Sequence, residues 1–139
     1  MLNEMERRTL EMLLAGDTLE LAVLRAQLDA ATATSRKFTG VGFFTQLSVP
    51  AGLPRVTRRG RLVLDDIYAE VSGLEHDAGF ALFVEDGAID VLECHIVDDC
   101  WPDNATLRRP YYVHPSSPGS SSIVETKQRD IKYALRHAV

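Results

Sequence analysis

The sequence has few cysteines and no long apolar segment. Its two cysteines, Cys94 and Cys100, are too few for a disulfide framework, and without an export signal we expect both to be reduced thiols. No stretch approaches the roughly 18 apolar residues of a membrane span, and the N-terminus shows no signal-peptide core. These absences predict a cytoplasmic protein without a membrane partner.

The chain also has fewer basic than acidic residues. The chain has 15 Lys and Arg residues against 20 Asp and Glu residues, which gives a formal net charge of −5. A general nucleic-acid binder needs a basic face, so this balance argues against a nucleic-acid partner. With 139 residues, 45% of them hydrophobic, the chain has the size and composition of one globular domain.

Motifs for catalysis and for cofactors are missing as well. The sequence contains no G-x-S-x-G, no H-E-x-x-H and no phosphate-binding G-x-x-x-x-G-K-[ST] pattern. Residues 93–100 gather Glu, Cys, His and Asp side chains, but their Cys-x5-Cys spacing lacks the knuckle of a structural zinc site. We therefore predict no metal, no cofactor and no catalytic residue.

The clearest structural signal is the stretch 78–102, AGFALFVEDGAIDVLECHIVDDCWP. Asp86 and Gly87 predict a two-residue type I′ turn, because both residue types tolerate positive φ. The resulting hairpin register pairs Phe80 with Glu93 and leaves one face of the hairpin almost wholly apolar. That face is expected to lie on the core.

The other segments complete a two-layer α+β fold. Apolar residues at helical spacing predict helices over 3–15 and 18–31, and the short joint between them predicts an N-terminal helical hairpin. Period-2 alternation predicts strands over 36–49 and 62–72. We expect the helical hairpin to pack on an antiparallel sheet of about four strands, with residues 1–102 forming a single domain.

Beyond Pro102 the composition changes. Residues 103–139 are rich in proline and serine, which predicts a C-terminal extension. A weak helical pattern over 124–138 predicts a terminal helix within it. The sequence leaves open whether this extension docks on the core, exchanges with a neighbouring chain or stays mobile.

The first group of candidate binding residues carries concentrated positive charge. It comprises Arg55, Arg58, Arg59 and Arg61, with no acid among them. Guanidinium groups bind phosphates and carboxylates through paired hydrogen bonds, so this loop could hold a small anionic ligand or an acidic partner. The alternative is a solvated loop whose arginines pair loosely with nearby acids.

The second group lies at the end of the predicted hairpin, at Glu93, His95 and Trp101. In the predicted register Glu93 ends the apolar face, where burial would suit it to acid–base chemistry together with His95. The alternative is that the core ends at Glu93, whose side chain then lies at the solvated edge of the core. Trp101 is an interface anchor or ligand lid in one interpretation, and a cover over the end of the core in the other.

Gly40 and Gly42 stand two apart on one face of the strand predicted over 36–49. Glycine weakens a strand, so the pair indicates a helix or aromatic ring packed on it, the close approach of another backbone, a bulge, or a ligand. The last interpretation makes these glycines the floor of a pocket beside Glu93 and His95.

Two stretches of the sequence resemble a known protein family. TGVGFFT at 39–45 and GFALFVEDGAIDVLE at 79–93 resemble a family of small uncharacterised bacterial proteins, and the likeness extends over roughly residues 10–102. The resemblance implies a compact cytoplasmic domain and no established activity.

The sequence as a whole favours a non-catalytic binding or protein-interaction domain. Its partner would be a protein, and self-association into a homodimer is the simplest case. The alternative is a small-molecule-binding protein or enzyme that uses Glu93 and His95 beside a pocket floored by Gly40 and Gly42.

Overall fold

A computed structural model describes residues 1–57, 60–97 and 99–138 of the chain. Among the helices of these residues, none has the length and apolar character needed to cross a bilayer. In chain order the elements are α1 (Glu4–Leu13), α2 (Leu19–Leu28), β1 (Thr32–Phe38), β2 (Gly42–Ser48), β3 (Arg61–Val71), β4 (Ala78–Glu85), β5 (Ala88–His95), β6 (Leu107–Pro115), β7 (Ile123–Thr126), α3 (Ile131–Ala134) and β8 (His137–Ala138).

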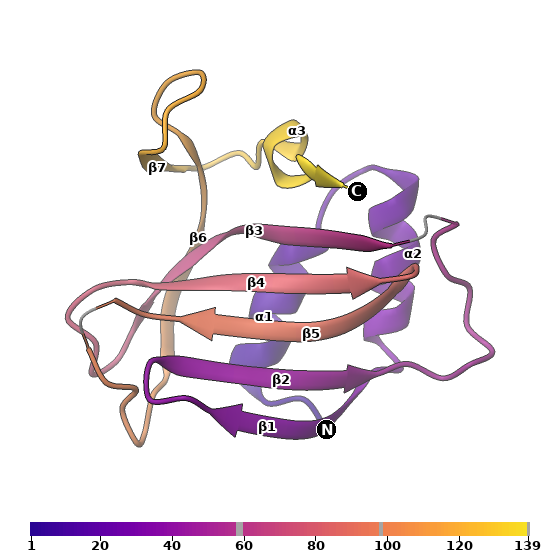
Figure 1. The fold of residues 1–139 in the computed structure, drawn as a ribbon, viewed down its shortest axis with the longest axis horizontal. Helices are drawn as coiled ribbons and strands as arrows, with labels where there is room; N and C mark the ends of the chain where they lie inside the picture. The colour runs from indigo at the N-terminus through magenta and orange to yellow at the C-terminus, as the bar shows by residue number, and fades with distance from the viewer. Residues whose placement is uncertain (58–59, 98, 139) are drawn as a thin grey trace.

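An antiparallel sheet dominates the fold. Its strands follow the order β1-β2-β5-β4-β3-β6-β7, and the short β8 pairs with β3. In Figure 1, α1 and α2 lie behind this sheet, so one face is covered and the other is turned to the viewer. The expected helical hairpin on about four strands is wrong. Seven strands form the path of the sheet, and α1 contacts the sheet more than it contacts α2.

Three features hide the additional strands from the sequence pattern. The edge strand β1, TATSRKF, is almost entirely exposed, so its side chains show no apolar alternation. The single strand expected over 36–49 is instead β1 and β2, because Gly40, with a φ of 84°, lies in the turn that reverses the chain. Strand β6 contains Pro110 and Pro115, yet it pairs with both β3 and β7.

The hairpin of β4 and β5 is confirmed, with φ values of 48° and 82° at its two turn residues. The predicted register holds only beside the turn. Asp90 forms a bulge in β5, so Phe80 faces Cys94 and Glu93 moves to the opposite face of the sheet. The expectation that Glu93 lies on the apolar face opposite Phe80 is therefore wrong.

The core lies between the covered face of the sheet and the two longer helices. Gln27 of α2 fixes the hairpin turn against this core, because its amide donates to the carbonyls of Pro54 and Gly87 and accepts from the N–H of Ile89. Each large apolar side chain buried there contributes roughly 1.5–3 kcal/mol before entropy is considered. The largest fully buried ones are Phe80, Leu10, Leu13, Leu14, Leu21, Leu24, Leu62, Leu64, Ile67, Leu82 and Leu92.

The residues after Pro102, expected as an extension, supply β6, β7, α3 and β8. A buried ion pair ties this segment to the core. The guanidinium of Arg129 donates to both carboxylate oxygens of Asp66, at 2.9 and 2.8 Å, and also to the carbonyls of Met12 and Ala15. Since Asp66 is fully buried in the middle of β3, the attachment reaches the interior of the domain.

Candidate binding site

A cavity of about 360 Å³ lies between the N-terminus of α1, the β1–β2 hairpin and the segment that joins β5 to β6. Its walls combine aromatic rings with charged groups. The rings belong to Phe38, Phe43 and Trp101, and the charged groups to Glu4, Glu6, Arg36 and Asp103. The size of the cavity suits a side chain or a small organic molecule.

The aromatic wall is built on a cross-strand pair. Phe38 of β1 and Phe43 of β2 face each other in the sheet register, which places both rings on the same face. Their centroids lie 6.2 Å apart with a 52° angle between the planes, and Trp101 meets Phe43 edge-on at 5.4 Å and 69°. The three rings therefore bound the cavity with differently inclined surfaces.

Backbone hydrogen bonds hold the Trp101 side of the cavity in place. The N–H of Trp101 donates to the carbonyl of Gly40 at 2.9 Å, and the N–H of Ile96 donates to that of Val41 at 2.9 Å. Further along the segment, Ser72 and Thr106 exchange backbone and side-chain hydrogen bonds. Because both ends of the segment are anchored to the sheet, the cavity is formed before any partner binds.

The polar wall is an ion pair between buried Glu6 and partly exposed Arg36. The carboxylate of Glu6 is fully buried and accepts from Nε and Nη2 of Arg36, at 2.7 and 2.8 Å, and from the hydroxyl of Thr45 at 2.7 Å. Burial raises the pKa of Glu6, but these hydrogen bonds and one from the Asn3 N–H outweigh it and hold that pKa below its ordinary value. Glu6 is therefore ionised and fixes Arg36 at the cavity.

Among the predicted site residues that the structure describes, Trp101 alone lines this cavity. Gly40 contributes the carbonyl that accepts from the Trp101 N–H. Gly42 instead lies against β5, where an added Cβ would stand 1.9 Å from the carbonyl oxygen of Cys94. The close approach of another backbone, one of the interpretations of the glycine pair, therefore accounts for Gly42.

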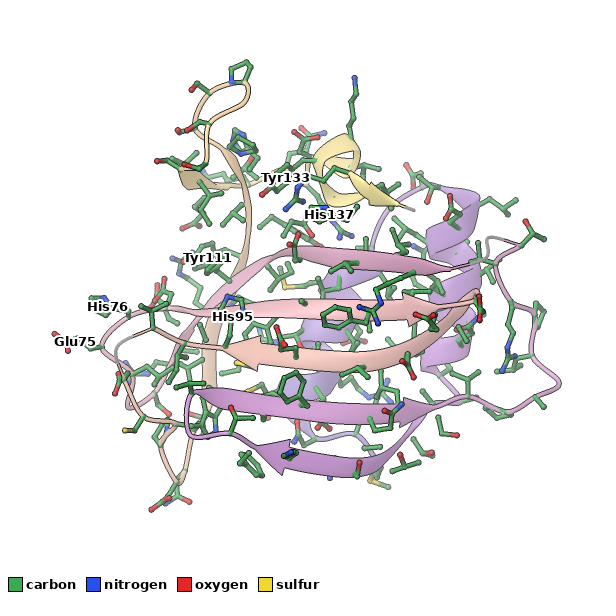
Figure 2. All side chains as sticks on the ribbon, in the orientation of Figure 1. Glu75, His76, His95, Tyr111, Tyr133 and His137 are labelled. Carbon is green, nitrogen blue, oxygen red and sulfur yellow. The ribbon has the colours of Figure 1, made fainter. Side chains whose placement is uncertain are left out.

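Glu93 and His95 lie on the uncovered face of the sheet, where Figure 2 labels His95. Nδ1 of His95 is 4.0 Å from Oε1 of Glu93, and the two side chains are 48% and 28% exposed. Neither the cavity nor a second hollow beside Gly16 includes them. Water therefore reaches both side chains, whereas acid–base catalysis is favoured where water is excluded.

The same face of the sheet carries a second polar group, at Tyr111. Its hydroxyl donates to the carboxylate of Asp77, and burial together with this hydrogen bond raises the pKa of Tyr111. Among residues 1–57, 60–97 and 99–138, no three His, Cys, Asp or Glu side chains form a group that could hold a metal ion.

Of the predicted arginine group, the two members that the structure describes, Arg55 and Arg61, do not line the cavity. Arg55 donates to the carbonyls of Pro50 and Leu53, while Arg61 lies 3.5 Å from a carboxylate oxygen of Glu85. Arg61 is also distant from the second predicted group. Arg61 and His95 pair with opposite ends of β4 and are therefore about 20 Å apart along the strand. The two remaining arginines, Arg58 and Arg59, lie outside the described residues.

The sequence did contain a signal for the polar wall. Glu6 stands four residues before Leu10 and seven before Leu13, so helical spacing places its carboxylate on the buried face of α1. A buried carboxylate requires a counter-charge and hydrogen-bond donors. The identity of its partner, Arg36, follows only from the packing of β1 and β2 beside α1.

Comparison of the chain with protein-family models, with curated proteins and with solved structures found no match.

Proposed function

We propose that this protein is a non-catalytic interaction module that binds a partner protein at the cavity. Three large apolar side chains are exposed at this end of the molecule: Phe38 is 63% exposed, Val41 53% and Val97 64%. Val41 lies in the β1–β2 turn, and Val97 follows Ile96, whose N–H donates to the Val41 carbonyl. We call these three residues, together with Trp101, the apolar rim.

The observation that carries this proposal is the position of the apolar rim beside a preformed aromatic cavity. Single exposed apolar residues are ordinary, whereas a group of them next to a pocket is typical of an interface. Binding energy at interfaces concentrates in pockets that accept an anchor side chain and are surrounded by contacts that exclude water. The apolar rim and the cavity have this arrangement.

The partner in this proposal is a different protein. Two copies of a chain with a net charge of −5 repel each other, which disfavours self-association unless the interface is strongly apolar. The uncovered sheet face gives weaker support as a binding surface, since it mixes apolar residues with Glu70, Asp65 and Glu93.

Substitution of the apolar rim is expected to release the partner. Immobilised wild-type protein and the variants Phe38→Ser and Val97→Ser would be compared by quantitative capture from an extract of cells that naturally make the protein. Loss of one buried apolar contact of roughly 1.5–3 kcal/mol predicts about a tenfold or larger reduction in captured partner. Both residues are mostly exposed, so thermal unfolding should change little.

The matched control is Leu19→Ser. Leu19 is 82% exposed at the start of α2 and does not line the cavity, so this variant loses similar apolar surface elsewhere. It should retain the partner at the wild-type level. Equal capture by all four proteins, or loss of the partner only in the Leu19 variant, would contradict the proposal.

A further inference from the structure

We propose that the cavity receives a basic side chain of the partner, either a lysine ammonium or an arginine guanidinium. This inference rests on the proposed interaction function and adds the chemistry of the anchor. Three features carry it: the balance of charges in the cavity wall, the aromatic rings, and the apolar side chains that continue from them.

The first feature is the sign of the charge. Three carboxylates and one guanidinium line the cavity, and the guanidinium of Arg36 is already bound to the carboxylate of Glu6 through two hydrogen bonds. The remaining charges belong to Glu4 and Asp103. Both side chains are exposed, and among the described residues neither forms a hydrogen bond or an ion pair through its carboxylate. The wall therefore presents uncompensated negative charge to a ligand.

The second feature is the aromatic wall. A cation near the face of a tryptophan or phenylalanine ring is attracted by the negative charge of the π system, most strongly at tryptophan. Phe38, Phe43 and Trp101 are inclined to one another by 52° and 69°, so they surround a cation from more than one direction. Carboxylates and aromatic rings together are how proteins recognise ammonium and guanidinium groups.

The third feature is the apolar part of the cavity wall, which suits the methylene stem of a basic side chain. Met5, Ala105 and Leu107 also line the cavity and are partly buried. The methylene chain of lysine or arginine packs on such apolar surface while its charged end reaches polar groups. An anionic anchor would be repelled by the carboxylates of Glu4 and Asp103. The charge of Arg36 is already neutralised by Glu6, so the cavity is a poor site for an anion.

The fluorescence of Trp101 provides the test, since it is the single tryptophan of the chain and lines the cavity. Wild-type protein would be titrated with three capped glycine-rich peptides that carry a central lysine, arginine or norleucine. Norleucine keeps the apolar stem of lysine and removes the ammonium. We expect saturable changes with the lysine and arginine peptides, at least tenfold weaker binding of the norleucine peptide, and weaker binding at high salt.

Removal of the two uncompensated carboxylates should weaken the binding of the lysine peptide. The double variant Glu4→Gln/Asp103→Asn is expected to lower its affinity at least fivefold, because each exposed ion pair contributes modestly. Glu11→Gln is the matched control, since Glu11 is exposed on the same helix and lies outside the cavity. That control should bind the peptide as the wild type does.

Several outcomes would overturn the inference. Equal binding of the norleucine and lysine peptides would show that the anchor is apolar, and an unchanged affinity in the double variant would remove the role of the carboxylates. Saturation by tetramethylammonium without binding of either basic peptide would indicate a free small cation instead of a side chain.

The two proposals can fail separately. If the Phe38→Ser variant loses the captured partner but no basic peptide binds, the interaction function stands and the basic anchor is wrong. If the lysine peptide binds but capture does not depend on Phe38 or Val97, the cation site stands and the proposed interaction surface is wrong.

Discussion

Replacement of Arg129 by alanine is expected to lower the free energy of unfolding by about 3–5 kcal/mol. The substitution leaves the carboxylate of Asp66, which is fully buried, without the two hydrogen bonds and the counter-charge that Arg129 supplies. It also removes donors from the carbonyls of Met12 and Ala15. Against a typical stability of 5–15 kcal/mol, such a loss threatens folding itself. Urea unfolding, followed by circular dichroism, measures it.

The chain offers a matched control for this prediction. Arg109 also bridges two carboxylates, those of Glu70 and Glu125, but its side chain is 48% exposed. Arg109→Ala should therefore leave the free energy of unfolding nearly unchanged, because ion pairs between solvated side chains contribute little. If the Arg129 variant were no less stable than the Arg109 variant, the C-terminal segment would not be part of the folded core. Joint replacement by Arg129→Met and Asp66→Leu should recover part of the loss, since no buried charge remains.

Glu6→Gln is expected to destabilise the protein at neutral pH by about 1–3 kcal/mol, because Arg36 loses the charge that it faces. The effect depends on pH. The folded-state pKa of Glu6 lies below its unfolded value, so the ionised carboxylate contributes its stability above an unfolded pKa of about 4.3. That contribution is lost as the pH falls through the folded pKa.

The difference in unfolding free energy between wild type and Glu6→Gln should therefore stay constant from neutral pH down to the unfolded pKa and shrink as the pH falls further toward the folded pKa of Glu6. Urea unfolding at several pH values gives this difference directly. Glu11→Gln on the exposed side of the same helix should match the wild type at each pH. A gap between wild type and the Glu6 variant that stayed constant or widened in acid would show that the Glu6 carboxylate does not stabilise the folded state as an anion.

The β4–β5 turn could be predicted because its cause is local. Asp86 and Gly87 both have positive φ, which these two residue types tolerate. The register beyond the turn depends on a distant strand: Gln46 of β2 donates to the carbonyl and the carboxylate of Asp90, the residue that forms the bulge. A single-sequence pattern contains no sign of that contact, so it placed Glu93 on the wrong face.

The extent of the sheet was missed for a related reason. Strand β6 carries two prolines, and a proline-rich segment normally indicates a loop. It becomes a strand because β3 and β7 pair with its two sides. Edge strand β1 shows no alternation because it buries almost nothing. In both cases the pairing partner, not the strand's own pattern, determines the structure.

The candidate site was predicted only at Trp101. The other parts of the cavity come from segments far apart in the chain: Arg36 is 30 residues from Glu6, and Thr45 is 39 residues from it. No motif spacing links such residues. The sequence does show an acid on the apolar face of α1, which is the one local sign that a polar wall is built there.

The most direct test of the central claim is site-specific photo-crosslinking at the apolar rim. The photoreactive residue p-benzoylphenylalanine would replace Phe38 in one protein and Leu19 in another, each expressed in cells that naturally make the protein. Because Phe38 borders the cavity and Leu19 lies away from it, we predict a discrete crosslinked protein from position 38 and none from position 19. Crosslinks from position 19 alone, or identical products from both positions, would contradict the account.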